Sequence, residues 1–319
     1  MRSRYRAVAI ALVLVGISAA PALAQSYPAK PVRFVIGPAP DVLARLVGQK
    51  LTDMWGQQIV VDQRPGAGGI IAADIVAKAQ PDGYTWLLST GAYTTLVVPY
   101  PKLPYDFVKD FAPVTLMATI PFLLVSHPSL QARSVQELTA MARARPDAIN
   151  YASSGTGTTA HLAAEMFSNM ARIKLVHVPY KGVPAALVGV ISGETQLMFA
   201  IMQAGFPHVK AGRLRALGVS SAKRSSSAPD IPTIAEAGVP GFEFISWNAI
   251  HVPLRTPQPV IAKIQRDVVT ALGDPDVRKR MFGLGMETMG STPAELAGLV
   301  RSDIAKWGKV IKDAGVRVQ

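Results

Sequence analysis

Short apolar runs alternate with amphipathic segments through most of the chain, and this alternation is the strongest constraint on its fold. Val32–Ile36 has the length of a strand, and residues 41–55 then carry apolar side chains at helical spacing, namely Leu43, Leu46, Val47, Leu51 and Met54. Further strands are expected at Gln58–Val61, Thr85–Leu88, Phe122–Val125, Ile149–Ala152, Gln196–Phe199 and Leu214–Val219. The pattern predicts an α/β fold with mostly parallel sheets covered on both faces by helices.

Capping signals mark several of the helices between these strands. Ser134 with Glu137 forms a capping box, and so does Thr292-Pro293-Ala294-Glu295, which also places proline at the first helical position. Helices are expected at Ile70–Ala79, from Ser134 to near Pro146, along a face made by Leu162, Met166, Phe167 and Met170, and at Val260–Leu272, Val277–Phe282 and Ala294–Ala314.

Two extended apolar stretches, Pro113–Val125 and Phe242–Val252, are candidates for crossings between domains. If both cross between the same two domains, residues 25–121 and 245–319 form a discontinuous first domain and residues 122–244 form the second. A chain that crosses twice produces a hinged pair with a cleft. The alternative is one domain of 295 residues, which its size disfavours.

The first 24 residues predict export. Arg2, Arg4 and Arg6 precede an apolar run, Ala7–Val15, and Ala22-Leu23-Ala24 supplies the small residues of a cleavage site, so a signal peptide ending before Gln25 is expected. An uncleaved anchor is the alternative, but the apolar run is shorter than the roughly 20 residues of a membrane span. Export of a chain without cysteine fits the bacterial periplasm better than a small disulfide-stapled domain.

The positive charge does not predict nucleic-acid binding. Loss of residues 1–24 removes three of the 33 basic residues and none of the 21 acidic ones, which lowers the formal net charge from +12 to +9. The remaining basic residues are dispersed, apart from Lys223-Arg224 and Arg278-Lys279-Arg280. A diffuse positive field instead favours the entry of anionic solutes into a cleft.

Three glycine-rich turns each follow a strand and open a helix: Gly37–Asp41, Arg64–Gly69 and Ser153–Thr159. Free amides and the positive end of the helix dipole meet at such a turn, which suits a carboxylate or phosphate. Glycine also permits a tight turn with no ligand, and both interpretations stay open for any single turn. The third turn adds several hydroxyls, so it is the best candidate for an anion site.

Several classes of chemistry lack their motifs. Gly66-Ala67-Gly68-Gly69 does not complete a dinucleotide fingerprint, and no Gly-Lys-Ser/Thr sequence ends a loop. A serine hydrolase could be built from Ser153 or Ser154 with His161 or His177, yet no Gly-x-Ser-x-Gly elbow exists. The five histidines are scattered, and zero cysteines exclude thiol chemistry, so neither a metal nor a cofactor is expected.

Motifs in these turns resemble the Bug family, the substrate-binding receptors of tripartite tricarboxylate transporters. The resemblance runs from Tyr27 nearly to the C-terminus. The motifs are Tyr27-Pro28-x-Lys30-Pro31, Arg64-Pro65-Gly66-Ala67-Gly68-Gly69, Pro81-Asp82-Gly83-Tyr84-Thr85, Leu103-Pro104-Tyr105-Asp106, Lys109-Asp110-Phe111, Tyr151-Ala152-Ser153-Ser154-Gly155, His177-Val178-Pro179-Tyr180-Lys181-Gly182, Leu214-Arg215-Ala216-Leu217 and Pro232-Thr233-x-x-Glu236-Ala237-Gly238.

The resemblance implies a periplasmic binding protein of type II (Venus-flytrap) with two α/β domains joined by a two-strand hinge. It implies a monomeric receptor, not an enzyme, that captures a small carboxylate-containing solute and delivers it to membrane permease subunits. Carried over to this chain, the ligand-binding residues are Ala39, Asp41, Ser89, Thr90, Ser153, Ser154, Gly155, Thr156, Gly157, Thr158 and Thr159, with Tyr180 and Lys181 near the mouth. Tyr180-Lys181-Gly182 can equally be only a turn before the helix opened by Pro184.

Two departures from the family pattern bear on specificity. The first loop usually reads aromatic-x-Pro-Gly-Gly-x-x-Asp, whereas Pro38-Ala39-Pro40 here runs directly into Asp41, about four residues short, and its prolines remove two amide donors. Ala200 stands where the family often has an acidic residue. Altered specificity or weak binding is therefore expected. A sensory co-receptor for a membrane kinase, with the same fold, and a periplasmic hydrolase remain the alternative functions.

Overall fold

The computed structural model describes residues 27–37, 41–64, 66, 69–96 and 103–313. The expected signal peptide lies outside these residues. The strands are β1 (Val32–Ile36), β2 (Ile59–Gln63), β3 (Thr85–Thr90), β4 (Phe111–Ser126), β5 (Asn150–Ser153), β6 (Val176–Pro179), β7 (Leu197–Ile201), β8 (Arg215–Val219), β9 (Ile245–Pro253) and β10 (Glu287–Thr288). The helices are α2 (Val42–Trp55), α3 (Ile70–Ala77), α4 (Gly91–Leu96), α5 (Val135–Ala144), α6 (Thr159–Ala171), α7 (Val183–Ile191), α8 (Met202–Lys210), α9 (Gln258–Gly273), α10 (Pro275–Gly283) and α11 (Pro293–Asp313).

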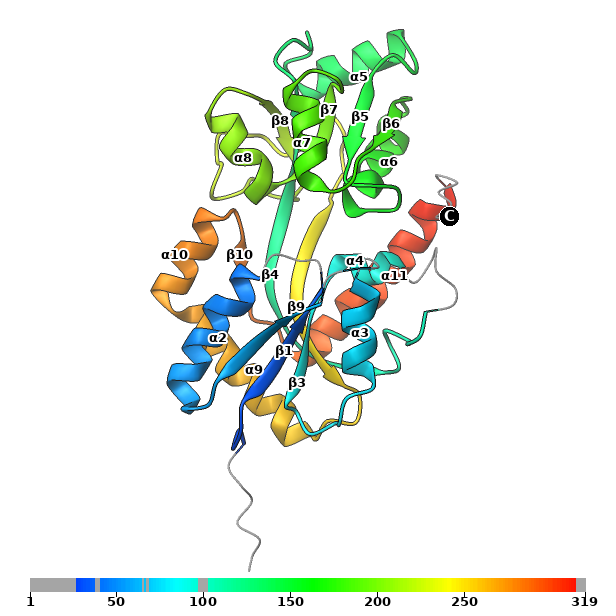
Figure 1. Cartoon of the computed structure of the whole chain (residues 1–319). Helices are drawn as coiled ribbons and strands as arrows, with labels where there is room; N and C mark the ends of the chain where they lie inside the picture. The colour runs from blue at the N-terminus through cyan, green and yellow to red at the C-terminus, as the bar shows by residue number, and fades with distance from the viewer. Residues whose placement is uncertain (1–26, 38–40, 65, 67–68, 97–102, 314–319) are drawn as a thin grey trace, which may run out of the picture.

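The strands are connected in the order β2-β1-β3-β9-β4-β7-β5-β6, and β8 and β10 also pair with β4. Strand β4 is therefore shared: its first part pairs with β9, and its last residues pair with β7 and β8. Figure 1 shows β4 and β9 running side by side between the lower and the upper group of elements. This is the two-domain architecture of type II binding proteins that the sequence predicts.

The expectation of mostly parallel sheets is wrong in part. Pairs within each group are parallel, namely β1 with β2 and β3, and β5 with β6 and β7. Strands β4 and β9, however, run antiparallel to each other and to the other strands that they pair with. Each of the two crosses between the groups once and in the opposite direction, so the sheet becomes mixed where the groups join.

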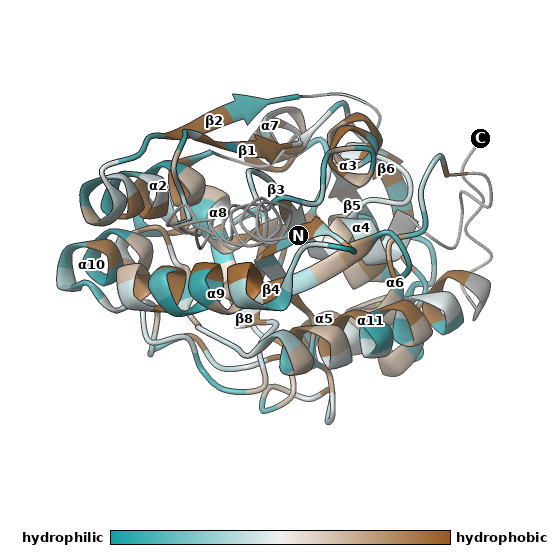
Figure 2. Cartoon of the chain, turned by 90° about the horizontal axis from the view of Figure 1, so that it is seen from below, coloured by the Kyte–Doolittle hydropathy of each residue, from teal (hydrophilic) through white to brown (hydrophobic). Residues whose placement is uncertain are grey.

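The helices form where the apolar spacing and the caps predict them. On α2 the buried side includes Leu43, Val47 and Leu51, and the helix ends at Gly56 in the left-handed conformation that glycine permits. Glu295 and Thr292 exchange side-chain and backbone hydrogen bonds at the start of α11. In Figure 2 the covering helices α2, α9 and α11 each carry a hydrophilic and a hydrophobic side.

Helix α11 links the two groups in a way that the sequence did not predict. Leu296 and Val300 near its start belong to the lower core with Trp247. Trp307 and Ile311 near its end belong to the upper core, which also contains Phe122 and Phe199. The described chain thus has a helix, besides β4 and β9, that connects both cores. The domain limits at residues 121 and 245 stay a prediction.

Candidate functional site

The predicted site residues follow strands whose carboxyl ends are directed toward the opposite group of elements. In the lower group, α2 follows β1 and α4 follows β3, and in the upper group, α6 follows β5 and α7 follows β6 (Figure 1). Helices α4 and α6 are in contact, so the turns after β3 and β5 lie close together. Carboxyl ends of parallel strands are the usual ligand-binding edge of an α/β sheet.

On the lower side, Tyr93 of α4 draws two of the glycine-rich turns together. Its hydroxyl donates a hydrogen bond to the carbonyl of Gly69 over 3.2 Å. A Cβ on Gly37 would lie 3.0 Å from that hydroxyl and 3.1 Å from Cα of Gly69. Burial raises the pKa of Tyr93 above its usual range. Both turns therefore need glycine at the point of contact. Tyr93 was not predicted as a site residue. Its position just after a strand is the only feature of the sequence that could have indicated this role.

The other predicted residues of the lower side have different environments. Ala39 lies outside the described residues. Asp41 begins α2 and forms an ion pair of 2.5 Å with Arg45, one turn further on. Thr90 ends β3, and its hydroxyl accepts from the amide of Ala92 at 3.3 Å. Ser89 is fully buried: its hydroxyl donates to the carbonyl of Ala249 at 3.1 Å and lies 2.7 Å from Nδ1 of His251.

The turn from Ser153 to Thr159, called here the Ser153 turn, contains several hydrogen bonds within the predicted site. Ser153 is buried, and its hydroxyl oxygen accepts from the amide of Gly155 at 3.1 Å. Gly155 and Gly157 have φ of 133° and 77°, which glycine adopts without strain. Thr158 donates its hydroxyl to the carbonyl of Gly155 at 2.7 Å and does not cap α6. The first amides of α6 are therefore left without a side-chain cap and could bind an anion.

Two histidines, the buried His161 and the half-buried His177, lie behind the Ser153 turn. Nδ1 of His161 accepts from the amide of Gly157 at 3.0 Å, and Nε2 of His177 lies 2.6 Å from the hydroxyl oxygen of Ser153. The hydrolase alternative paired Ser153 or Ser154 with His161 or His177, and of these combinations Ser153 with His177 is in hydrogen-bonding contact. Because Ser153 is wholly buried, its hydroxyl has no access to an ester substrate.

Tyr180 is connected to the Ser153 turn through its backbone. The amide of Tyr180 donates to the carbonyl of Ser153 at 2.9 Å, and the amide of Gly182 donates to that of Ser154 at 3.2 Å. The ring of Tyr180 instead packs on α7, where a Cβ on Gly189 would lie 2.3 Å from its hydroxyl oxygen. Lys181 is exposed. The structure thus brings the backbone of this segment to the turn and directs the Tyr180 ring onto a helix.

Ala200, the second departure, lies at the end of β7 and is fully buried. A Cβ on Gly205 of α8 would lie 2.8 Å from its Cβ. This close approach leaves no room for a carboxylate beside Gly205. Alanine at position 200, where the family often has an acidic residue, therefore fits the close packing of α8 on β7.

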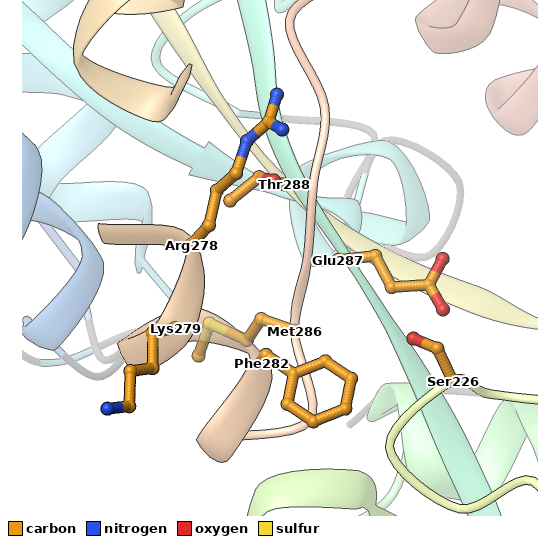
Figure 3. Close-up of a pocket in the computed structure, with 7 residues that line it drawn as sticks. All are labelled: Ser226, Arg278, Lys279, Phe282, Met286, Glu287 and Thr288. Carbon is orange, nitrogen blue, oxygen red and sulfur yellow. The ribbon is translucent and has the colours of Figure 1, made fainter. Parts of the chain in front are cut away.

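A groove of about 480 Å³ lies elsewhere, beside α10 and β10 (Figure 3). Ser226 comes from the upper group, and the other lining residues come from α10 and the segment after it: Arg278, Lys279, Phe282, Met286, Glu287 and Thr288. None of these was predicted as a site residue. In the part of the chain that the structure describes, no group of three or more His, Asp or Glu side chains could hold a metal ion. No helix among those residues has the length and apolar character of a membrane span.

Comparison with known proteins identifies relatives over nearly the whole chain. Residues 43–316 match the family described as the tripartite tricarboxylate transporter family receptor. A protein encoded in the tcbD-tcbE intergenic region of Pseudomonas sp. strain P51 is 38% identical over 310 residues, which cover 95% of this chain and 91% of that protein.

Two solved structures carry ligands in their descriptions. Rpa4515 of Rhodopseudomonas palustris with adipate is 36% identical, has a TM-score of 0.82, and the match covers 91% of this chain and 99% of that one. MatC from the same species, with bound malate, is 31% identical, has a TM-score of 0.77, and the match covers 89% and 100%. Both ligands are small dicarboxylates.

Proposed function

Because the chain belongs to the tripartite tricarboxylate transporter receptors, a family of periplasmic solute-binding proteins and not of enzymes, we propose that it captures a small carboxylate-containing solute and delivers it to a membrane permease. Adipate and malate in the related structures indicate the size and charge of such a solute. The solute lies between residues 25–121 with 245–319 on one side and residues 122–244 on the other.

The observation that carries this proposal is the Ser153 turn at the uncapped start of α6. The amides of Gly155 and Gly157 are bonded within the protein and shape the turn. The first amides of α6 have no side-chain cap, because the hydroxyl of Thr158 is bonded to Gly155. A carboxylate placed there accepts hydrogen bonds from the amides and is stabilised by the helix dipole. The contact between α4 and α6 supports the proposal, because Thr90 directly precedes α4 and would line the opposite wall. No bond is made or broken, and closure of the two domains retains the solute.

The solute is identified by what copurifies with the protein. The full-length chain is expressed and the exported protein is purified from the periplasm without denaturation. The bound small molecules are released by heat, and mass spectrometry identifies them. We expect a di- or tricarboxylate in about one equivalent. A bound neutral sugar or a nucleotide would contradict the proposal. The mass of the same sample tests cleavage before Gln25.

The short first loop predicts a ligand preference that differs from that of relatives with the full loop. Insertion of four residues, including two glycines, before Asp41 supplies amide donors on the lower side and should raise affinity for adipate and malate. Tight binding of an ordinary family ligand that is unchanged by this insertion would show that the loop has no influence. Delivery is tested separately: deletion of the gene should abolish uptake of the identified solute, and deletion of the permease genes should do the same.

A further inference from the structure

Two histidine rings lie stacked against the rear of the Ser153 turn, one from α6 and one from β6. The ring centroids of His161 and His177 are 3.9 Å apart, and their planes differ by 8°. Tyr151 of β5 extends the stack, with its centroid 5.0 Å from that of His177. His161 is only 5% exposed. The two residues are 16 positions apart in the sequence, and ligand capture as proposed above does not use them.

The bond between His161 and Gly157 fixes the protonation state of the ring. A backbone amide can only donate, so Nδ1 of His161 must be an unprotonated acceptor in this 3.0 Å contact. The neutral ring then carries its proton on Nε2, which lies 3.8 Å from Oε1 of Glu165. Protonation of Nδ1 would point its N–H group at the N–H group of Gly157, so the hydrogen bond between them would be lost.

The surroundings of the pair also favour neutral rings. The titratable groups that face them from α6, β5 and β6 are Glu165 and Tyr151, and the Tyr151 hydroxyl donates to Glu165 at 2.5 Å. Strand β7 and helices α4 and α11 also contact α6. Two charged groups of α11 are bonded elsewhere: Asp303 accepts from the Trp247 indole, and Lys306 donates to the carbonyl of Glu243. Burial lowers the pKa of His161 to about 4. The pKa of His177 is also lowered to about 4, chiefly by burial and partly by repulsion from His161, while Glu165 acts in the opposite direction.

We infer that His161 and His177 are positioning residues for the Ser153 turn: as neutral stacked rings they hold its amides in the ligand-binding arrangement, and protonation of His161 releases the turn and with it the carboxylate. An imidazolium near the site would also attract an anion. Protonation of Nδ1 of His161 removes the acceptor of the Gly157 amide. The turn then loses the bond that fixes its shape, and with it the orientation of the uncapped amides that hold the ligand, so acid weakens binding. The inference rests on the proposed function for the identity of the ligand. The hydrogen bonds between the histidines and the turn do not depend on that function, because they form without a ligand.

The first test follows the histidines in unliganded residues 25–319 by nuclear magnetic resonance from pH 7.5 to 3.5. Side-chain nitrogen shifts should show an unprotonated Nδ1 on His161 at neutral pH. The amide of Gly157 should shift with the protonation of His161 near pH 4. The control is the half-buried His127, whose ring contacts Ser129: His127→Phe should leave the pH dependence of that amide unchanged. A Gly157 amide that ignores the titration of His161, or an Nδ1 proton on that ring at pH 7.5, would overturn the inference.

The second test compares variants by calorimetry with adipate and malate. At pH 7.5, His161→Phe keeps a stacked ring without the acceptor and should bind about 10-fold more weakly, whereas His127→Phe should bind as the wild type does. His161→Gln offers an amide oxygen that accepts at any pH. As the pH is lowered from 7.5 to 4.5, the ratio of its affinity to that of the wild type should rise. Protonation of the ligand affects both proteins equally and therefore cancels in this ratio.

The outcomes separate this inference from the proposed function. If the wild type binds and His161→Phe binds equally well, the inference is wrong and the receptor function stands. If the wild type binds no carboxylate, the proposed function is wrong, and the resonance of the Gly157 amide still decides whether the histidines hold the turn. The same measurement on the wild type decides the matter if the Phe variant fails to fold.

Discussion

The indole of Trp307, near the end of α11, packs against the ring of Phe244, with centroids 4.8 Å apart. Trp307 is 3% exposed, and Phe244 in turn contacts Phe122 of β4 edge-on. Since α11 starts on the lower core, this contact joins the two halves of the molecule beside the hinge strands. Closure of the two domains must therefore either preserve or break the contact between Trp307 and Phe244.

Replacement of Trp307 by alanine should lower the free energy of unfolding by about 3 kcal/mol, because it leaves a large cavity between α11 and the upper core. Urea denaturation measures the change. Phe282→Ala removes an aromatic ring that is 49% exposed and should cost less than about 1 kcal/mol. Equal effects of the two substitutions would show that α11 does not hold the halves together.

His251 should make the protein sensitive to acid. Burial lowers the pKa of His251 from 6.5 to about 3, while the unfolded chain takes up the proton near pH 6.5. Unfolding therefore binds a proton below pH 6.5, and stability falls as the pH falls, by about 3 kcal/mol at pH 4.5 from this residue. Unfolding free energies between pH 7.5 and 4.5 should have a smaller slope in His251→Gln.

The matched control is His127→Gln, which removes a half-buried ring and should change the slope less than His251→Gln does. Only the slope is compared, so a constant stability cost of the glutamine does not affect the conclusion. Identical slopes for the wild type and His251→Gln would mean that His251 is protonated in the folded protein.

Ala200→Asp should destabilise the fold by about 3 kcal/mol or more, because it buries a carboxylate against Gly205 with no partner. Thermal unfolding compares it with Ala262→Asp on the exposed side of α9, which should change the melting temperature little. If Ala200→Asp is stable and binds solute normally, the packing of α8 on β7 adapts to the family's acidic residue.

Local signals in the sequence predicted most of the fold. Apolar spacing, capping boxes and glycine turns depend on neighbouring residues, and α2, α5 and α11 form where such signals lie. Strand β4 has 16 residues because two domains share it. From the sequence it was predicted only as an extended apolar stretch. The direction of β4 and β9 was missed, since alternation of strands and helices contains no information about strands that cross between sheets.

The candidate site was predicted less completely. The Ser153 turn could be found because its hydroxyls and glycines are consecutive. Sequence alone could not show that Ser89 and Ser153 are buried and bonded within the protein, nor that the Tyr180 ring lies on Gly189. These contacts join residues that are far apart in the chain. For the same reason the pairing of His161 with His177 was not foreseen.

Substitution of two glycines that have nearly equal φ angles tests the receptor function most directly. Gly157 in the Ser153 turn and Gly241 in a distant exposed turn have φ of 77° and 78°, so alanine strains both by a similar 1 to 2 kcal/mol, approximately. Calorimetric titration with adipate and malate should give saturable binding for the wild type and for Gly241→Ala, and at least about 10-fold weaker binding for Gly157→Ala. No saturable binding by the wild type, or equal affinity in Gly157→Ala, would contradict the assignment of this turn as the carboxylate site.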